Sequence, residues 1–159
     1  KEQWIEARVQ EMVAPEAIED PDASAAAGRV ARLALDLGVL AGDFLLWVET
    51  GGQVVPVSLK DVLDQRDRYH GCLTRDPLEP EYDGGRLVGR LYLMQARPAL
   101  HSFAHGGKTY RLHRALDRRV ANRVLAAAAI SRVGDNRMTY VRQMNPDLVH
   151  SASQGHAFD

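Results

Sequence analysis

The sequence RLVGRLYLMQARPALHSFAHGGKTYRLH, residues 86–113, contains three successive segments with strand patterns. Its first part, Arg86–Met94, reads as a strand, and a second strand runs from Pro98 into a glycine turn at Gly106-Gly107. In the third part, Lys108–His113, successive side chains alternate between two faces, as they do in a strand. The stretch therefore predicts a three-stranded antiparallel meander.

A β-hairpin and a helix are predicted upstream of the meander. The sequence FLLWVETGGQVVPVSL (Phe44–Leu59) has apolar runs on both sides of Gly51-Gly52, and a glycine pair suits a tight hairpin turn. Pro56 favours an edge position for the second strand, because proline cannot donate a hydrogen bond to a neighbouring strand. Ser58 has the spacing of a helix cap and predicts a helix that continues to about Tyr69.

Two further helices are predicted at the N-terminus and one near the C-terminus. The apolar residues of Trp4–Val13 recur near one helical face. Ser24–Gly38 has Ser24 as its N-cap and Gly38 as its end, with Val30, Leu33 and Leu37 on one face. Asp117–Gly134 is rich in alanine and predicts a long helix.

The fold class expected from these elements is α+β: N-terminal helices, a hairpin, a three-stranded ribbon-like meander and a long C-terminal helix. We expect four regions along the chain. They are an N-terminal helical and hairpin region (1–68), the meander (69–114), a C-terminal helix region (115–144) and a flexible tail (145–159).

Composition and charge narrow the function classes. The 159 residues contain one cysteine, Cys72, and no apolar run approaches the roughly 18 residues of a membrane span, so we expect a cytoplasmic chain without a membrane partner. Residues 1–85 carry eight basic and 17 acidic side chains, whereas residues 86–123 carry nine basic and one acidic. Such a basic segment favours a polyanionic partner, single-stranded or duplex nucleic acid. The alternative is that the acidic half neutralises it.

Aromatic residues lie among the cations of the meander. Rings on a sheet face can stack on bases while neighbouring cations contact phosphates. The alternative is that the rings face the core and only the cations face water. The predicted nucleic-acid-binding residues are Arg86, Arg90, Arg97, Lys108, Tyr110, Arg111, Arg114 and Arg118.

The sequence HSFAHGG (101–107) raises the question of a metal site. His101, His105 and His113, with Cys72 or Asp76, could supply three or four metal ligands. Along a strand the three histidines lie too far apart for one ion unless the turn folds back. We therefore expect no metal, no cofactor and no catalytic residue. A metal-dependent hydrolase is the remaining enzymatic alternative, and the candidate ligands are Asp76, Glu79, His101 and His105.

Two motifs carry a resemblance. DPLEPEYDGG (Asp76–Gly85) and HSFAHGGKTYRL (His101–Leu112) resemble a segment found in phage- and plasmid-encoded primase–helicase proteins. More remotely, the two motifs are similar to the zinc ribbon of bacterial primases. The four ligand positions of that ribbon align with Asp76, Glu79, Ser102 and His105.

The resemblance implies a ribbon that has kept its hairpins and lost its metal. In such a ribbon HSFAHGG shapes a turn, and apolar packing replaces the ion. The residues expected to pack there are Leu78, Leu91, Leu93, Leu100 and Phe103.

The predicted function is a non-catalytic nucleic-acid-associated module of a mobile-element DNA replication primase–helicase. Other replication domains would then be further partners. The alternative is a small phage or mobile-element protein that binds and inhibits a host protein complex, for example a defence system, through the acidic N-terminal half.

Overall fold

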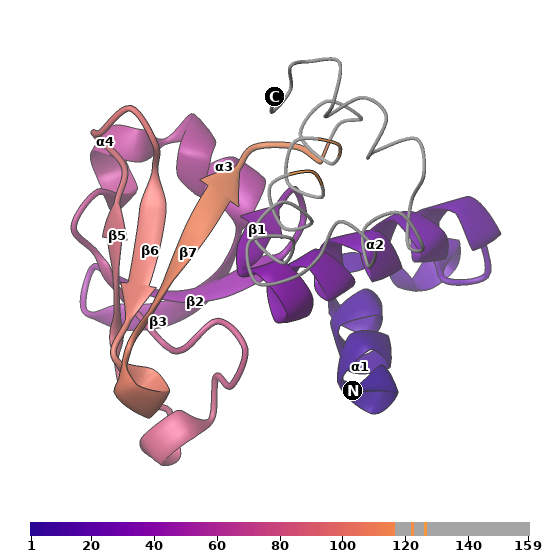
Figure 1. Ribbon diagram of the computed structural model, residues 1–159, viewed down its shortest axis with the longest axis horizontal. Helices are drawn as coiled ribbons and strands as arrows, with labels where there is room; N and C mark the ends of the chain where they lie inside the picture. The colour runs from indigo at the N-terminus through magenta and orange to yellow at the C-terminus, as the bar shows by residue number, and fades with distance from the viewer. Residues whose placement is uncertain (117–121, 123–125, 127–159) are drawn as a thin grey trace, which may run out of the picture. The chain divides into compact units, whose positions relative to one another are not determined.

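The computed structural model describes residues 1–116, 122 and 126 of the chain (Figure 1). Lys1–Leu116 form one compact unit of the α+β class, as predicted. Its N-terminal helices accompany a curled mixed sheet of seven strands, where the sequence predicted a separate hairpin and a three-stranded meander. Apart from residues 122 and 126, the predicted long helix Asp117–Gly134 lies outside the described residues, and so do most of the region 115–144 and the whole tail 145–159.

The elements follow one another in a simple order. The helices and 3₁₀ turns are α1 (Glu2–Met12), η1 (Pro15–Ala17), α2 (Pro21–Leu37), α3 (Leu59–Asp64), α4 (Arg66–Tyr69), η2 (Tyr82–Gly84) and η3 (Ala104–Gly106). The strands are β1 (Val39–Ala41), β2 (Leu45–Thr50), β3 (Gln53–Ser58), β4 (Leu73–Thr74), β5 (Gly89–Tyr92), β6 (Ala99–Ser102) and β7 (Lys108–His113).

The strand order of the sheet is β1-β7-β6-β5-β4-β2-β3. The meander β5-β6-β7 is antiparallel, as predicted, and the two-residue strand β4 joins it to the hairpin β2-β3. β1 pairs in parallel with β7, which makes the sheet mixed. One sheet therefore contains strands from both of the predicted regions, residues 1–68 and 69–114 (Figure 1).

The hairpin β2-β3 confirms the prediction from the glycine pair. Thr50 pairs with Gln53, so Gly51 and Gly52 alone form the turn. Both glycines have positive φ values, 60° and 78°, as a type I′ turn requires. β3 lies at the edge of the sheet, where Pro56 removes no hydrogen bond to a further strand.

Helix α2 begins earlier than predicted. Its N-cap is Asp20, whose carboxylate accepts a hydrogen bond from the Asp22 backbone N–H, and Pro21 occupies the first turn. Ser24 is inside the helix and donates its hydroxyl to the Ile18 carbonyl. The prediction of Ser24 as the cap is therefore wrong, because an Asp-Pro pair supplies both the capping acceptor and a φ angle suited to a first turn.

The buried side of α2 also differs from the prediction. The buried residues are Ala27, Ala31 and Ala34, whereas the predicted leucine face is only half-buried. Small side chains let a helix backbone approach its neighbours closely, and α2 packs against both α1 and β1. Gly38 ends the helix in the left-handed conformation, as predicted.

Two element boundaries and one strand differ from the sequence prediction. Ser58 caps α3 as expected, but Gln65 leaves helical geometry and divides the predicted helix into α3 and α4. β5 begins at Gly89 rather than Arg86. β1 was not predicted.

The core lies between α3, α4 and the inner face of the sheet. Its fully buried members include Phe44, Leu46, Leu59, Val62, Leu91 and Leu100. Trp4 from α1 packs against this core and donates its indole N–H to the Leu78 carbonyl at 2.8 Å. The N-terminal helix therefore contacts the turn that contains the first motif, DPLEPEYDGG.

Candidate nucleic-acid interface

The exposed side of the meander carries a defined set of side chains. Strand register places Arg90, His101 and Thr109 in one row, and Tyr92, Ala99 and Arg111 in the next. The row between them, Leu91, Leu100 and Tyr110, points into the core, since these three residues are buried. We call the side formed by Arg90, Tyr92, His101, Thr109 and Arg111 the outer face.

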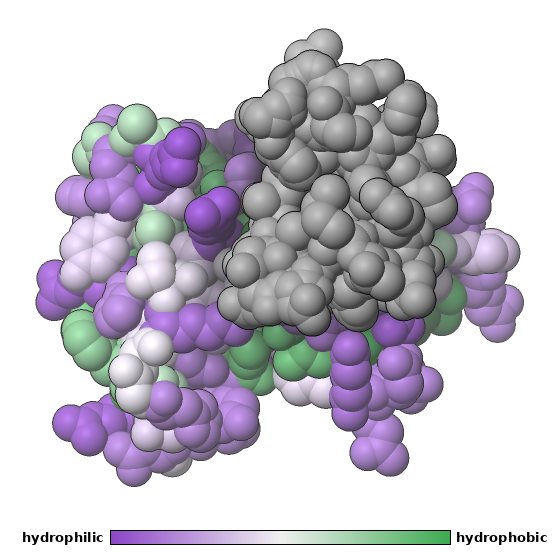
Figure 2. All heavy atoms as spheres, viewed as in Figure 1, coloured by the Kyte–Doolittle hydropathy of each residue, from purple (hydrophilic) through white to green (hydrophobic). Residues whose placement is uncertain are grey.

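The outer face is polar and lacks acidic residues. The sequence from Arg86 to Leu116 contains no Asp or Glu, so no carboxylate on these strands opposes the arginines. His101 Nδ1 lies 2.8 Å from Thr109 Oγ1, which holds the imidazole across the two strands. Figure 2 shows mostly hydrophilic residues over the part of the surface where the meander lies. A face with positive side chains and no negative ones suits phosphate groups.

Tyr110 and Lys108 do not belong to this face. Tyr110 is 2% exposed, so its ring packs in the core and offers no free surface to a base. Burial, together with the nearby Asp76 and Glu79 carboxylates, raises the pKa of the Tyr110 hydroxyl. Lys108 lies on the same side of β7 as Tyr110, and its Nζ lies 5.0 Å from the centre of the Tyr110 ring. The surface position expected for Tyr110 is therefore wrong, and Lys108 points to the opposite side of the sheet from Arg90 and Arg111.

The remaining predicted contacts are spread around the meander. Arg86 precedes β5 and forms an ion pair with Asp83 at 3.2 Å. Arg97 is exposed in the bend between β5 and β6. Arg114 follows β7 and binds both oxygens of Asp64 at 2.6 and 3.0 Å. Arg118 lies outside the described residues. Of the predicted cations that the structure describes, Arg90 and Arg111 are the two that lie on the outer face.

The pair between Arg114 and Asp64 makes a pH-dependent prediction. Hydrogen bonds from Arg114 lower the pKa of the Asp64 carboxyl. A lowered pKa in the folded chain means that Asp64 stabilises the fold above its unfolded pKa, and that this contribution disappears as pH falls through the folded pKa. We expect Arg114→Ala to return the Asp64 pKa to its ordinary range in an NMR titration. Arg86→Ala should leave it unchanged; an unchanged Asp64 pKa in Arg114→Ala would contradict the pair.

The two motifs meet at one end of the meander, where the turns η2 and η3 lie side by side (Figure 1). Asp76 is 4% exposed and accepts the Ser102 hydroxyl at 2.6 Å and the Leu78 and Glu79 backbone N–H groups at 3.1 and 2.8 Å. Glu79 contacts His105 at 2.9 Å. The four positions aligned with zinc ligands thus form two hydrogen-bonded pairs.

Both histidines of HSFAHGG have protein partners. His101 contacts Thr109, and His105 contacts Glu79 while its ring packs edge-on against Tyr82 at 4.7 Å. His105 has a positive φ of 50°, so it forms part of the turn itself. Across the part of the chain that the structure describes, no three His, Cys, Asp or Glu side chains come together in a way that could hold a metal ion.

The apolar residues expected to pack around the two motifs do so with one exception. Leu91, Leu93 and Leu100 are fully buried, and Leu78 packs against the core from its edge. Phe103 is 67% exposed, so its expected packing role is wrong. Sequence reasoning also missed that Asp76 is a buried acceptor. Its only local signal is Pro77, which follows it and leads into a turn that can fold back onto the carboxylate.

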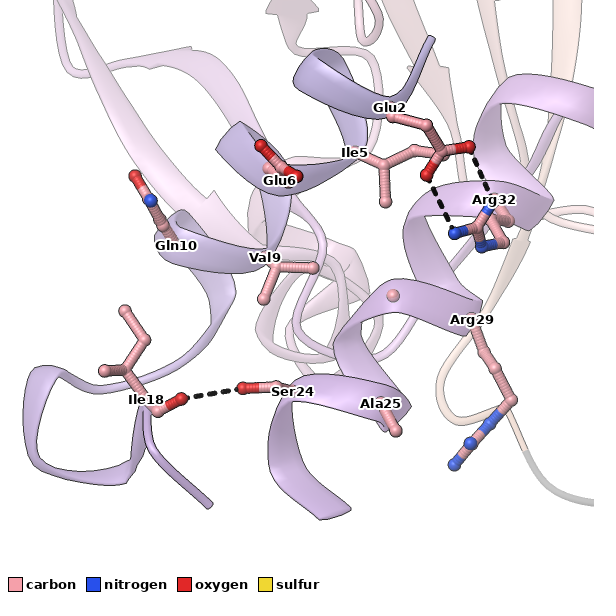
Figure 3. A pocket seen from close by; sticks show the side chains of 11 residues that line it. Glu2, Ile5, Glu6, Val9, Gln10, Ile18, Ser24, Ala25, Arg29 and Arg32 are labelled. Carbon is pink, nitrogen blue, oxygen red and sulfur yellow. Dashed lines mark hydrogen bonds and ion pairs between the residues drawn. The ribbon is translucent and has the colours of Figure 1, made fainter. Parts of the chain in front are cut away.

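A groove of about 630 Å³ lies between α1 and α2 (Figure 3). Ile5, Val9 and Ile18 supply its apolar lining. Glu2 and Arg32 form an ion pair beside it at 3.0 Å, so charges of both signs meet there. Because charges of both signs line this groove, its charge does not favour a basic partner. Within residues 1–116, 122 and 126, no helix is both long and apolar enough to cross a bilayer.

Comparison with known proteins gave no match: no family model, no curated protein and no solved structure is similar to this chain at the level that defines a match. The resemblance to primase–helicase proteins therefore stays a prediction from the two motifs.

Proposed function

We propose that this chain is a non-catalytic module of a mobile-element DNA replication primase–helicase, which contacts the backbone of DNA or RNA through the outer face. The observation that carries this proposal is the placement of Arg90 and Arg111 on one exposed sheet face, within a stretch that has no acidic residue. At the four positions aligned with the zinc ligands, Asp76 bonds to Ser102 and Glu79 to His105. These contacts support the interpretation as a ribbon that is held by polar contacts. The site of action would be cytoplasmic.

Binding of this kind is electrostatic, so its salt dependence identifies it. Each neutralised phosphate of a single strand contributes a slope of about −0.7 to the dependence of log affinity on log salt concentration. Two arginines on the outer face therefore predict a slope that falls in magnitude by about 1.4 when both are replaced. The measurement is fluorescence anisotropy of a labelled single-stranded oligonucleotide at several salt concentrations.

We expect Arg90→Glu/Arg111→Glu to weaken binding at least about tenfold, because two attractive contacts become repulsive. Lys108→Glu reverses the same charge on the opposite side of the sheet and is expected to have a much smaller effect. Arg29→Glu/Arg32→Glu, at two exposed residues of α2, changes the net charge by the same four units and is the matched control. If the outer-face double variant binds as tightly as this control, the outer face is not the interface.

The alternative function is binding of a host protein. It rests on the acidic N-terminal half, and the mixed charge of the α1–α2 groove does not favour it. Absence of oligonucleotide binding at low salt would leave this alternative as the better explanation of the chain.

A further inference from the structure

A hollow of about 370 Å³ adjoins the outer face at the end of the meander where the two motifs meet. Its lining includes Leu73, Tyr82, Arg86, Leu87, Arg90 and Phe103. Arg90 belongs to both the hollow and the outer face, so the two surfaces are continuous. The volume is within the range of about 300–1,000 Å³ that is typical of small-molecule sites.

Phe103 stands out in this hollow. With 67% of its surface exposed, it is the most exposed large hydrophobic residue of those described. Its position is nevertheless fixed: its backbone N–H donates to the Val88 carbonyl at 2.8 Å, and its ring meets the His101 ring edge-on at 4.7 Å and 76°. His101 is held in turn by Thr109. An aromatic ring that is exposed and already ordered can stack on a planar group with little loss of conformational entropy.

The charges around Phe103 favour an anionic ligand. Arg86 and Arg90 line the hollow together with one acidic residue, Asp83. Asp83 pairs with Arg86 at 3.2 Å, whereas among the described residues the Arg90 side chain has one polar contact, with the Gly71 carbonyl at 3.4 Å. A planar group on the ring with an anion beside it matches one nucleotide of a nucleic-acid strand.

We propose that Phe103 stacks on an unpaired base of a single-stranded nucleic acid, while Arg86 and Arg90 contact the flanking phosphates. The inference rests on the proposed function, because a nucleic-acid strand bound to the outer face would continue into the hollow. It adds a preference for single strands over duplex. A base inside a duplex is stacked on both sides and has no free face for Phe103.

The test compares equal lengths of single-stranded and duplex oligonucleotide by fluorescence anisotropy, and uses the variants Phe103→Ala and Phe103→Trp. We expect Phe103→Ala to weaken single-strand binding about tenfold or more and to leave duplex binding unchanged. Phe103→Trp should retain single-strand binding. Ile18→Ala removes another exposed hydrophobic residue, 40% exposed, and is the matched control.

A second readout reports stacking directly. An oligonucleotide that contains 2-aminopurine should change its fluorescence on binding to wild-type protein and not on binding to Phe103→Ala at saturating concentration. Excess mononucleotide tests whether the hollow takes a free nucleotide instead: equal competition per molecule would overturn the strand proposal.

The outcomes distinguish failure of the stacking site at Phe103 from failure of the proposed function. If Phe103→Ala binds single strands normally while Arg90→Glu/Arg111→Glu does not, the stacking site is wrong and the proposed function survives. If the wild-type chain binds no oligonucleotide at low salt, both are wrong.

Discussion

Replacing Asp76 with alanine is expected to lower the free energy of unfolding by about 3 kcal/mol, because it removes the shared acceptor of three hydrogen bonds. Hydrogen bonds to a charged acceptor contribute about 1.5–3 kcal/mol each, and donors left buried without a partner add a desolvation cost. Removal of the buried charge recovers the desolvation cost of the carboxylate itself, which offsets part of this sum. The Ser102 hydroxyl and the Leu78 and Glu79 backbone N–H groups all point at this carboxylate. Ser102 is itself 1% exposed, so water does not readily replace the lost acceptor.

Urea unfolding of matched variants measures this effect. Asp43→Ala removes an exposed carboxylate that pairs with Lys60 at 3.2 Å, and surface pairs contribute about 0–1 kcal/mol. Ser102→Ala should cost less than Asp76→Ala, because the two backbone donors keep their acceptor. A loss in Asp76→Ala no larger than in Asp43→Ala would show that this contact between the motifs does not stabilise the fold.

Gly89→Ala is expected to destabilise the chain by about 2–3 kcal/mol through overpacking. A Cβ at Gly89 would overlap Thr74 Oγ1 and would lie 3.3 Å from Leu100 Cδ2. Thr74 is fully buried between β2 and β5, and its hydroxyl has no hydrogen-bond partner among the described residues. Either the Thr74 side chain or the strand backbone must therefore shift to admit the methyl group, and a backbone shift would disturb both pairings of β4.

Two companion variants isolate the cause of that loss. Thr74→Ala removes the overlapping oxygen, so it should recover part of the stability when combined with Gly89→Ala in a double-mutant cycle. Gly28→Ala in α2 meets no atom within 4 Å and should stabilise the chain by about 1 kcal/mol, the ordinary helical preference for alanine. Thermal unfolding compares all four proteins. Additive effects of Thr74→Ala and Gly89→Ala would contradict the steric explanation.

Elements with local sequence signals could be predicted before the structure was known. Gly51-Gly52 specified the hairpin because both positions need a positive φ, and Ser58 specified the start of α3 because its hydroxyl accepts the Asp61 backbone N–H. The alternation in Lys108–His113 predicted β7, and Arg90 and Arg111 were among the eight binding residues named from the charge pattern. Each of these features depends on residues close together in the chain.

The tertiary structure decided which side of each element faces the core. Alternation shows that Tyr110 and Arg111 point in opposite directions, but it does not say which of them is buried; that depends on strands β6 and β1 beside them. β1 carries no local signal because its three residues are all buried and show no alternation, and it forms by parallel pairing with residues 72 positions away, such as Val39 with Arg111. The contact of Asp76 with Ser102 and the exposure of Phe103 are likewise set by pairing between distant segments, which the local periodicity of a sequence does not encode.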